Sequence, residues 1–590
     1  MKFKKLFFFT LLYLAFFLIR GGSNFYIYST ENFKNQDIVA GIVPHHLLAS
    51  PLIDSFFYYL STQDHPHTIV ILSPDHFLSC VLEENNSFLA PDLSAPSSEL
   101  KQVKIDSELG KRLRKSIQIN SNQSAIIAEH GVMELIPFIK KYLPATMILP
   151  LLVPAKTNRE EIEDLVEAIY FQANYPIILI ASVDFSHFLP QQVADFHDLR
   201  SIRVIINREK DAFNNLDVDC WQALYAIRYF AHLVQGEEFI LLGKYNSNDF
   251  LTQEVEKTTS YCSAVFTRVK KGEDSLNSTI KNNFCHDYEK VKTIIMVGDL
   301  MLDRGIKELI MKNGLYYPFQ KINRLLKGVD LVVGNLEGPV VEIPPESPIN
   351  SLKFSFSPQI LLGAVWGNFN LFSLANNHIL DRGKKGLEET QKWLERYDLK
   401  FVGNPLQNSL SFPDTSFKDK DLNLLAFNQI PPYFITEEEI VNIVEKEKID
   451  NSDKFLIVML HWGKEYTSFP TPNQRVLAHQ LIEKGADLII GHHPHLVQNI
   501  ELYQDRLIFY SLGNFIFDQY FSAETQEGLV VGVEIYTDKI IYRLFPIQIN
   551  QGQPRLMENK LSEDFLKKLA YRSDREISQD IEKGIIKLER

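Results

Sequence analysis

Residues 486–495 read ADLIIGHHPH, and this stretch decides how the chain is expected to fold. A short aliphatic run ends at Gly491, and three histidines follow within the next four residues. Such a run, ending abruptly in polar side chains, is typical of a buried strand in a parallel sheet. Ligands of open α/β sheets bind beyond the carboxyl ends of the strands. The stretch therefore predicts an α/β fold with a ligand site at His493 and His495.

The same pattern recurs in both halves of the chain. Short aliphatic runs end in His, Asp, Asn or Glu, and longer amphipathic stretches separate them. This alternation predicts mostly parallel sheets covered by helices on both faces, with the polar strand ends of each half converging into one site. The runs lead to His45, His76 and Asp184 in the first half, and to Asp299, Glu337, Asn377, His461 and His493 in the second.

The domain organisation follows from shifts in composition. Residues 37–269 and 291–555 show the alternating pattern, and they predict two α/β domains. Residues 270–290 between them are polar and predict a linker, because they cannot bury enough apolar surface to fold alone. Residues 556–590 combine helical spacing with heavy charge, so we expect a helical tail at the surface.

The first 23 residues have the features of an export segment. Lys2, Lys4 and Lys5 precede an apolar run over residues 6–19, and Arg20 closes it. The run fits the apolar core of a signal peptide and is shorter than the ~20 residues that span a bilayer. We therefore expect an extracytoplasmic protein that is either secreted or anchored in the membrane by this segment.

The overall charge argues against one class of partner. The chain has 590 residues and a formal net charge of −13. Binding to nucleic acid requires clustered Lys and Arg against the phosphates, so we expect no nucleic-acid partner. Four cysteines without CxxC spacing also argue against a disulfide scaffold or a cysteine-based zinc site.

The second half carries a candidate two-metal hydrolase site. Imidazole and carboxylate ligands together suit divalent Zn, Fe or Mn, and paired metals activate a water in many hydrolases. Asn377 can offer its amide oxygen to a metal or donate to a substrate, and Arg304 is a candidate for binding a substrate anion. The candidate metal ligands are Asp299, Glu337, Asn377, His378, His461, His493 and His495, and the candidate catalytic residues are His378, His461, Asn377 and Arg304.

These residues lie in motifs that resemble a known family. GDLMLDRG, NLEG, ANNHILDRG, HWGKEY, GHHPHLVQ and SLGNFIFD follow one another between residues 291 and 550, and together they are similar to the CapA family. The resemblance implies a metallophosphatase-like fold of layered sheets and helices, and a role in the synthesis of poly-γ-glutamate capsule. General metallophosphoesterases begin with Asp-x-His, whereas Leu300 and Met301 follow Asp299 here, so one ligand is missing or replaced.

The first half predicts a second, separate metal pocket. Its candidate ligands are His45, His76, Asp184 and His187, with the pair Glu129-His130 at the rim. PHHLLAS, SPDH, EHGVMELIPF and SVDFSHF resemble the Memo-like family, which includes the AmmeMemoRadiSam system protein B. The resemblance implies a fold like that of non-haem iron dioxygenases and a metal-binding or redox role. A cysteine ligand known in some members would fall near residues 246–248, where this chain has none.

Three functions remain open on the sequence alone. The first is a metal-dependent phosphoesterase that acts on an anionic polymer or phosphoester, alongside other proteins of envelope-polymer synthesis. The second is a non-catalytic component that binds or assembles an anionic envelope polymer. The third is a redox or dioxygenase-type metal enzyme centred on the first half.

Overall fold

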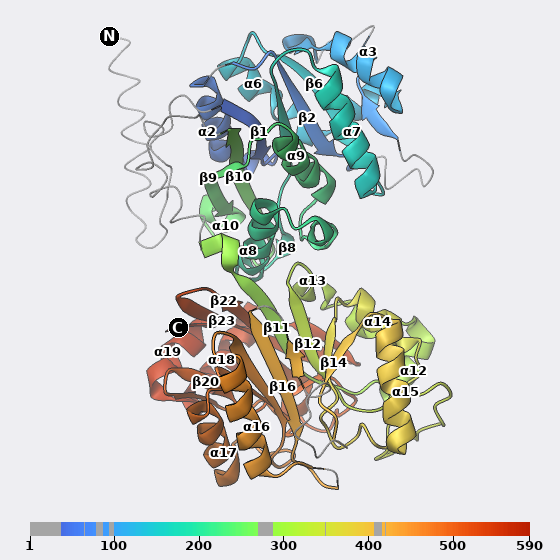
Figure 1. Ribbon diagram of the computed structural model, residues 1–590, viewed down its shortest axis with the longest axis vertical. Helices are drawn as coiled ribbons and strands as arrows, with labels where there is room; N and C mark the ends of the chain where they lie inside the picture. Colours follow the sequence, from blue (N-terminus) through green and yellow to red (C-terminus); the bar gives the residue numbers. More distant parts are fainter. Residues whose placement is uncertain are drawn as a thin grey trace.

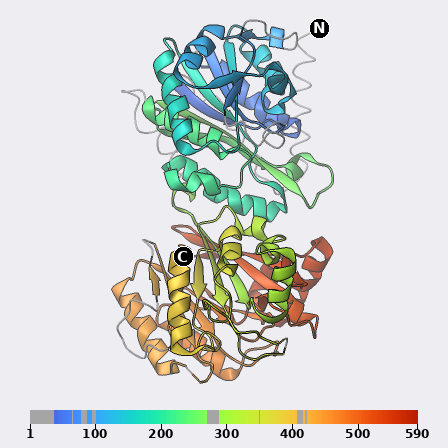
Figure 2. The ribbon, with the colours of Figure 1, turned by 90° about the vertical axis from the view of Figure 1, so that its right-hand side faces the viewer.

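The computed structural model describes residues 37–590, apart from 64, 78–86, 94–99, 269–286, 349, 406–415, 419–420 and 433. The predicted export segment and most of the predicted linker lie outside the described residues. The described chain forms two lobes stacked along the long axis of the molecule (Figures 1 and 2). No helix within the described residues is both long and apolar enough to cross a membrane.

The N-terminal lobe is built on one ten-stranded sheet. Its strands are β1 (Asp37–Val43), β2 (Thr68–Pro74), β3 (Phe88–Ala90), β4 (Lys104–Ile105), β5 (Ile119–Ser121), β6 (Met147–Val153), β7 (Ile177–Ser182), β8 (His187–Leu189), β9 (Glu238–Asn246) and β10 (Thr258–Arg268). The order is β5-β3-β6-β2-β7-β1-β10-β8, with β4 beside β6 and β9 beside β10. Neighbours among β6, β2, β7 and β1 are parallel, and β10 is antiparallel to β1.

Helices cover both faces of this sheet, which confirms the predicted α/β class. They are α2 (Ser50–Ser61), α3 (Ser107–Ser116), α4 (Gln123–Ala128), α5 (His130–Met133), α6 (Ile136–Tyr142), α7 (Arg159–Gln172), α8 (Gln191–Asn207), α9 (Trp221–Leu233) and α10 (Ser247–Phe250). Alternate residues of β2 enter different cores: Val70 and Leu72 pack under α3, α7 and α9, and Ile69 and Ile71 pack under α2, α4 and α6. A strand buried on both faces needs this continuous apolar run.

The C-terminal lobe contains two sheets. The larger comprises β11 (Lys292–Leu300), β12 (Leu331–Leu336), β13 (Leu371–Ser373), β14 (Lys400–Val402), β21 (Asn514–Ile516), β22 (Glu527–Ile535), β23 (Lys539–Asn550), β24 (Gln553–Leu556) and β25 (Ile585–Glu589). The smaller comprises β15 (Ser416–Lys418), β16 (Leu422–Asn428), β17 (Phe455–His461), β18 (Leu488–His492), β19 (Ile500–Tyr503) and β20 (Arg506–Phe509). Ile294 and Met296 of β11 share one core with Ile457 and Met459 of β17, so the sheets face each other.

Helices pack against both sheets, most of them on the outer faces and the last two at the core between the sheets. They are α12 (Arg304–Asn313), α13 (Asn323–Leu326), α14 (Ile360–Trp366), α15 (Gly383–Arg396), α16 (Glu437–Asp450), α17 (Pro472–Glu483), α18 (Asn559–Arg572) and α19 (Ser578–Lys583). Ile295 of β11 packs with α12, α14 and α15, and Val458 of β17 packs with α16 and α17. The lobe therefore has the predicted layers, with two sheets between two sets of helices (Figure 1).

The end of the chain differs from the predicted tail. Residues 556–590 do not form a separate surface helix: α18 and α19 bury Leu569 and Ile581 in the core between the sheets, and β25 pairs with β23. In the sequence, many charged residues separate these buried positions, so the segment has the composition of a surface helix. The last residues are therefore an edge of the larger sheet.

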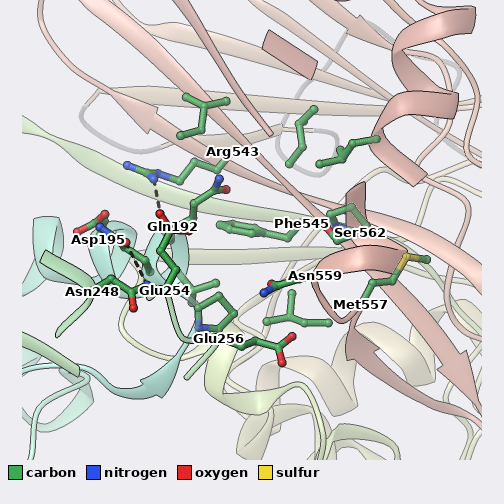
Figure 3. A pocket seen from close by; sticks show the side chains of 18 of the residues that line it. Gln192, Asp195, Asn248, Glu254, Glu256, Arg543, Phe545, Met557, Asn559 and Ser562 are labelled. Carbon is green, nitrogen blue, oxygen red and sulfur yellow. Dashed lines mark hydrogen bonds between the residues drawn. The ribbon is translucent and has the colours of Figure 1, made fainter. Parts of the chain in front are cut away.

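The two lobes are joined by more than the linker. α8 of the N-terminal lobe contributes Val193 and Phe196 to the core of the C-terminal lobe. Arg203 of α8 donates two hydrogen bonds to the Asp330 carboxylate, at 2.5 and 2.6 Å. A cavity of about 440 Å³ lies along the same seam, where Arg543 of β23 donates to the carbonyl oxygen of Gln192 (Figure 3).

Two candidate metal centres

The strand ends of the C-terminal lobe meet between its two sheets. In the larger sheet, Asp299 of β11 pairs in register with Asn335 of β12. Glu337 follows Asn335 by two residues. In the smaller sheet, His461 of β17 is level with His492 of β18. Parallel pairing within each sheet, and packing between the sheets, thus bring the predicted residues to one place. Asp299, Glu337 and His495 are all buried, and each offers a ligand atom within 4.8 Å of the others.

Glu337 stands at the centre of this group. Its side chain is fully buried, and neither carboxylate oxygen has a hydrogen-bond partner. Oε1 lies 3.9 Å from Nε2 of His378 and 3.8 Å from Nε2 of His495. These distances are too long for hydrogen bonds, but two ligands of one ion at ~2.1 Å lie only slightly closer together. A buried carboxylate without partners is costly, so this one fits the role of a metal ligand.

The two histidines that face Glu337 are held by their other nitrogen. Nδ1 of His378 lies 2.9 Å from the Asp381 carboxylate, and Nδ1 of His495 lies 3.0 Å from the amide oxygen of Asn514. Since both partners accept hydrogen bonds, each Nδ1 carries a proton. This arrangement leaves Nε2 directed at Glu337, as in metal sites whose histidines are oriented by carboxylates or amides.

Asp299 and His495 shift the pKa of each other, with Nδ1 of His495 3.2 Å from the Asp299 carboxylate. Burial alone would raise the pKa of Asp299, but hydrogen bonding with His492 and His495 holds it well below its usual range. Burial alone would lower the pKa of His495, but Glu337 and Asp299 raise it to about 9. Burial raises the pKa of Glu337 well above its usual range. The pKa values of these three groups are therefore shifted mainly by their burial and by one another, as expected of groups that share one small site.

His461 takes a different role from the predicted one. One amide hydrogen of Asn335 reaches Nδ1 of His461 at 3.2 Å, so Nε2 carries the ring proton and donates to the amide oxygen of Asn377 at 2.8 Å. Burial lowers the pKa of His461 well below its usual value, which keeps the ring neutral. With both nitrogens engaged, His461 orients Asn377 and is neither a free ligand nor a strong acid. Asn377 in turn keeps its amide hydrogens to donate.

Arg304 is also not placed as predicted. Its guanidinium is paired with Asp518, donates to the Ser351 carbonyl at 3.1 Å, and lies over the rings of Phe354 and Phe517. This charge is neutralised, so Arg304 supports the loop after β11 and is not free to bind a substrate anion.

A second ligand group overlaps the first at His495. Glu465, His493 and His495 each offer a ligand atom within 4.8 Å of the others. Nδ1 of His493 is buried without a partner. The backbone of His493 and His495 has φ of 92° and 58°, an uncommon conformation that is typical of functional sites. Glu465 was not predicted, although it lies in the HWGKEY motif.

The strand ends of the N-terminal lobe form a second centre. Val43 of β1 is level with Ser182 of β7, so His45 and Asp184 leave the sheet side by side. His45, His76 and His130 offer ligand atoms within 4.8 Å of one another, and so do His45, Asp184 and Asp219. The convergence on His45, His76 and Asp184 follows the sequence pattern.

Two positions in this centre differ from the prediction. His187, at the start of β8, belongs to neither group, and His130 takes the place expected for it. Asp219 was not predicted at all. It precedes α9 without a strand before it, so no strand-end pattern marks it. Its Oδ2 instead accepts a hydrogen bond from the Asp184 backbone N–H at 3.1 Å.

Comparisons with known proteins match the two lobes separately. The family model described as "Memo-like protein" matches residues 23–263, and "Bacterial capsule synthesis protein PGA_cap" matches residues 293–519. The chain is a fusion of a Memo-like region and a CapA-like region. This result confirms both resemblances inferred from the motifs.

Relatives of both regions are known. The capsule biosynthesis protein CapA of Bacillus anthracis is 29% identical over 321 residues, which cover 51% of this chain and 76% of the relative. The PGA biosynthesis protein CapA of Bacillus subtilis is 29% identical over 290 residues, covering 45% and 74%. A MEMO1 family protein of Caldivirga maquilingensis is 24% identical over 196 residues, covering 31% and 66%. The Glu337 centre therefore lies in the CapA-like lobe, and the His45 centre in the Memo-like lobe.

Proposed function

We propose that the CapA-like lobe is a divalent-metal-dependent hydrolase of the phosphoesterase type that acts in the biosynthesis of an anionic envelope polymer. The observation that carries this proposal is the Glu337 carboxylate, which is buried, has no hydrogen-bond partner, and faces Nε2 of His378 and of His495. The names of the Bacillus relatives support a polymer of the poly-γ-glutamate type.

The residues of this site divide into ligands and substrate-binding groups. Asp299, Glu337, His378 and His495 would hold the metal, and His493 with Glu465 would extend the site. Bound Mn, Fe or Zn would supply an activated water and polarise the oxygen of a phosphoester. Asn377, fixed by His461, would donate a hydrogen bond to the substrate anion. The partly buried position of Asn377 leaves it accessible to a ligand.

Metal content and turnover of the purified full-length chain test this proposal. We expect bound Mn, Fe or Zn in the CapA-like lobe, and hydrolysis of at least one phosphoester from a panel that includes phosphorylated polymer fragments. The number of metal ions bound per chain is measured in a His45→Ala/His76→Ala variant, so that metal held by the Memo-like lobe does not contribute. Polymer binding that survives full chelation, with no turnover on any substrate, would instead favour a non-catalytic assembly component.

The proposal also includes the location of the chain. We propose that it is exported by the segment over residues 1–23 and acts outside the cytoplasm, with other proteins of envelope-polymer synthesis as partners. The charge pattern of that segment and the capsule-related names of the relatives support this location. Protease added to intact cells, or to protoplasts, should digest the chain as completely as it does after lysis. Protection until lysis would contradict export.

A further inference from the structure

We infer that the phenol of Tyr466 is a catalytic group of the CapA-like lobe, which donates a hydrogen bond to the leaving-group oxygen of the substrate. The inference rests on the proposed phosphoesterase function and deepens it, because it names a residue that acts on the alcohol side of the ester. Negative charge develops on that oxygen as the bond to phosphorus breaks, and a fixed donor stabilises it. His461 cannot supply this donor, since both of its nitrogens are engaged.

Tyr466 is held against the turn that carries the candidate ligands. Its backbone N–H donates to the carbonyl oxygen of Pro494 at 2.9 Å, between His493 and His495. The centroid of its ring lies 6.0 Å from that of the His495 ring. Its φ of 58° is uncommon for a bulky residue, and such strained positions are concentrated at functional sites. The backbone therefore keeps the side chain beside the metal centre in spite of an energetic cost.

A chain of hydrogen bonds fixes the direction of the phenol hydrogen. The amide nitrogen of Asn514 donates to the Thr525 carbonyl at 2.9 Å and to Oε1 of Gln519 at 3.0 Å. Because a backbone carbonyl can only accept, the first bond fixes the orientation of the Asn514 amide. Gln519 therefore accepts with Oε1 and donates with Nε2, which lies 3.1 Å from the Tyr466 oxygen. The phenol oxygen accepts this bond, so its own hydrogen is directed elsewhere.

The phenol hydrogen is directed into the second ligand group. Burial, together with the Glu465 carboxylate that accepts this hydrogen, raises the pKa of Tyr466 to about 12. The phenol therefore keeps its hydrogen and acts as a donor. Glu465 forms the second ligand group with His493 and His495. With Glu465 bound to a metal, the phenol hydrogen would be available to an oxygen of the substrate.

The exposure of Tyr466 indicates which part of the substrate it meets. Its side chain is 44% exposed and contacts the exposed ring of Phe521, with 5.1 Å between the centroids. Asp299, Glu337 and His495 are buried. The phenol thus lies at the rim of the site, between the buried ligands and solvent. A phosphoryl group held by the ligands would have its alcohol part extending outward, so the oxygen that joins the two parts would lie level with the rim.

Turnover of two phosphoesters, one with an alkyl and one with a p-nitrophenyl leaving group, tests the assignment. Tyr466→Phe keeps the ring and removes the donor. We expect kcat for the alkyl ester to fall by about 100-fold, and kcat for the nitrophenyl ester by less than about 3-fold, because p-nitrophenolate is stable without a hydrogen bond. Metal content and the calorimetric affinity for inorganic phosphate, which has no leaving group, should equal those of the parent.

Gln519→Glu tests the direction of the hydrogen while Tyr466 stays intact. The new carboxylate can still accept from Asn514 but cannot donate to the phenol, so it draws the phenol hydrogen to itself. We expect the same selective loss on the alkyl ester, with kcat between those of the parent and of Tyr466→Phe. The matched control is Tyr503→Phe, which removes a phenol that donates to the Glu483 carboxylate at 2.8 Å in the same lobe. This control should hydrolyse both esters like the parent.

The outcomes separate the role of Tyr466 from the phosphoesterase function itself. Equal losses on the two esters would overturn the role, and so would unchanged turnover of the alkyl ester in Tyr466→Phe. Loss of metal in Tyr466→Phe would overturn it too, because the phenol would then only orient Glu465. In each of these cases the parent still hydrolyses phosphoesters, and the proposed function stands. A parent that hydrolyses neither ester contradicts both.

Discussion

A Glu337→Gln variant is expected to lose the metal of the CapA-like lobe and on the order of 100-fold or more of its hydrolytic turnover, while remaining fully folded. Glutamine keeps the shape of the side chain but removes the charge, and it presents amide hydrogens to a cation. Because the carboxylate has no hydrogen bond to lose, its removal relieves a desolvation cost, and stability should be unchanged or slightly higher. Metal analysis, thermal unfolding and turnover on one preparation measure all three quantities.

Glu447→Gln is the matched control for this variant. Glu447 is buried in α16 and accepts hydrogen bonds from Asn423 and Asn451 at 2.7 and 2.8 Å, which a glutamine oxygen can still accept. Its metal content and turnover should match those of the wild type. If Glu337→Gln kept its metal and melted at a lower temperature, Glu337 would be a structural residue and the proposed centre would be wrong.

The sequence predicts much of this centre because the carboxyl ends of neighbouring parallel strands lie side by side at one edge of a sheet. Once β11 and β12 are recognised as neighbouring parallel strands, Asp299 and Glu337 leave the larger sheet at the same edge, and the packing of the two sheets brings His495 beside them. The order of the CapA-like motifs along the chain then indicates which aliphatic runs belong to the same lobe. Local pattern is therefore enough to predict the fold class and to mark polar residues at strand ends as candidates for one site.

Other features depend on contacts that local pattern does not contain. Asp219 reaches the His45 cluster through a turn before α9, and only the folded structure shows that its carboxylate lies 3.4 Å from Nε2 of His45. His461 follows a strand as a ligand should, yet hydrogen bonds from Asn335 and to Asn377 occupy both of its nitrogens. In the sequence, nothing near Arg304 neutralises its charge. In the folded chain it pairs with Asp518, which lies more than two hundred residues further along.

The contact between the two lobes is also not predictable from the sequence. Composition marks residues 270–290 as a polar linker, but it cannot show that α8 lies against the CapA-like lobe. Asp330 accepts hydrogen bonds from Arg203 and from Arg200, and also from the backbone and hydroxyl of Thr293. Both arginine side chains are almost entirely buried. A buried ion-pair cluster therefore joins the lobes, with Arg200 and Arg203 from the Memo-like lobe and Asp330 from the CapA-like lobe.

An Asp330→Ala variant is expected to destabilise the chain by ~3–5 kcal/mol, because it leaves the buried guanidinium of Arg200 without a carboxylate and that of Arg203 with Glu209 alone. The loss should separate the lobes, so that thermal unfolding changes from one transition to two and protease cleaves between them. The control is Asp211→Ala, which removes an exposed partner of Arg159 and should cost ~0–1 kcal/mol. A single unshifted transition in Asp330→Ala would show that apolar contacts of α8 alone hold the lobes together.

The pH dependence of stability gives an independent check on the same contact. Burial alone would raise the pKa of Asp330, but Arg203 and Arg200 lower it to about 2. A carboxyl group whose pKa is lower in the folded state contributes stability above its unfolded pKa of ~3.9 and loses that contribution as the pH falls toward the folded value. The difference in unfolding free energy between wild type and Asp330→Ala should therefore be constant from pH 7 to about 5 and shrink below about 4. A difference that is unchanged at pH 3 would show that Asp330 acts through its shape and hydrogen bonds to Thr293, and that its charge is not what joins the lobes.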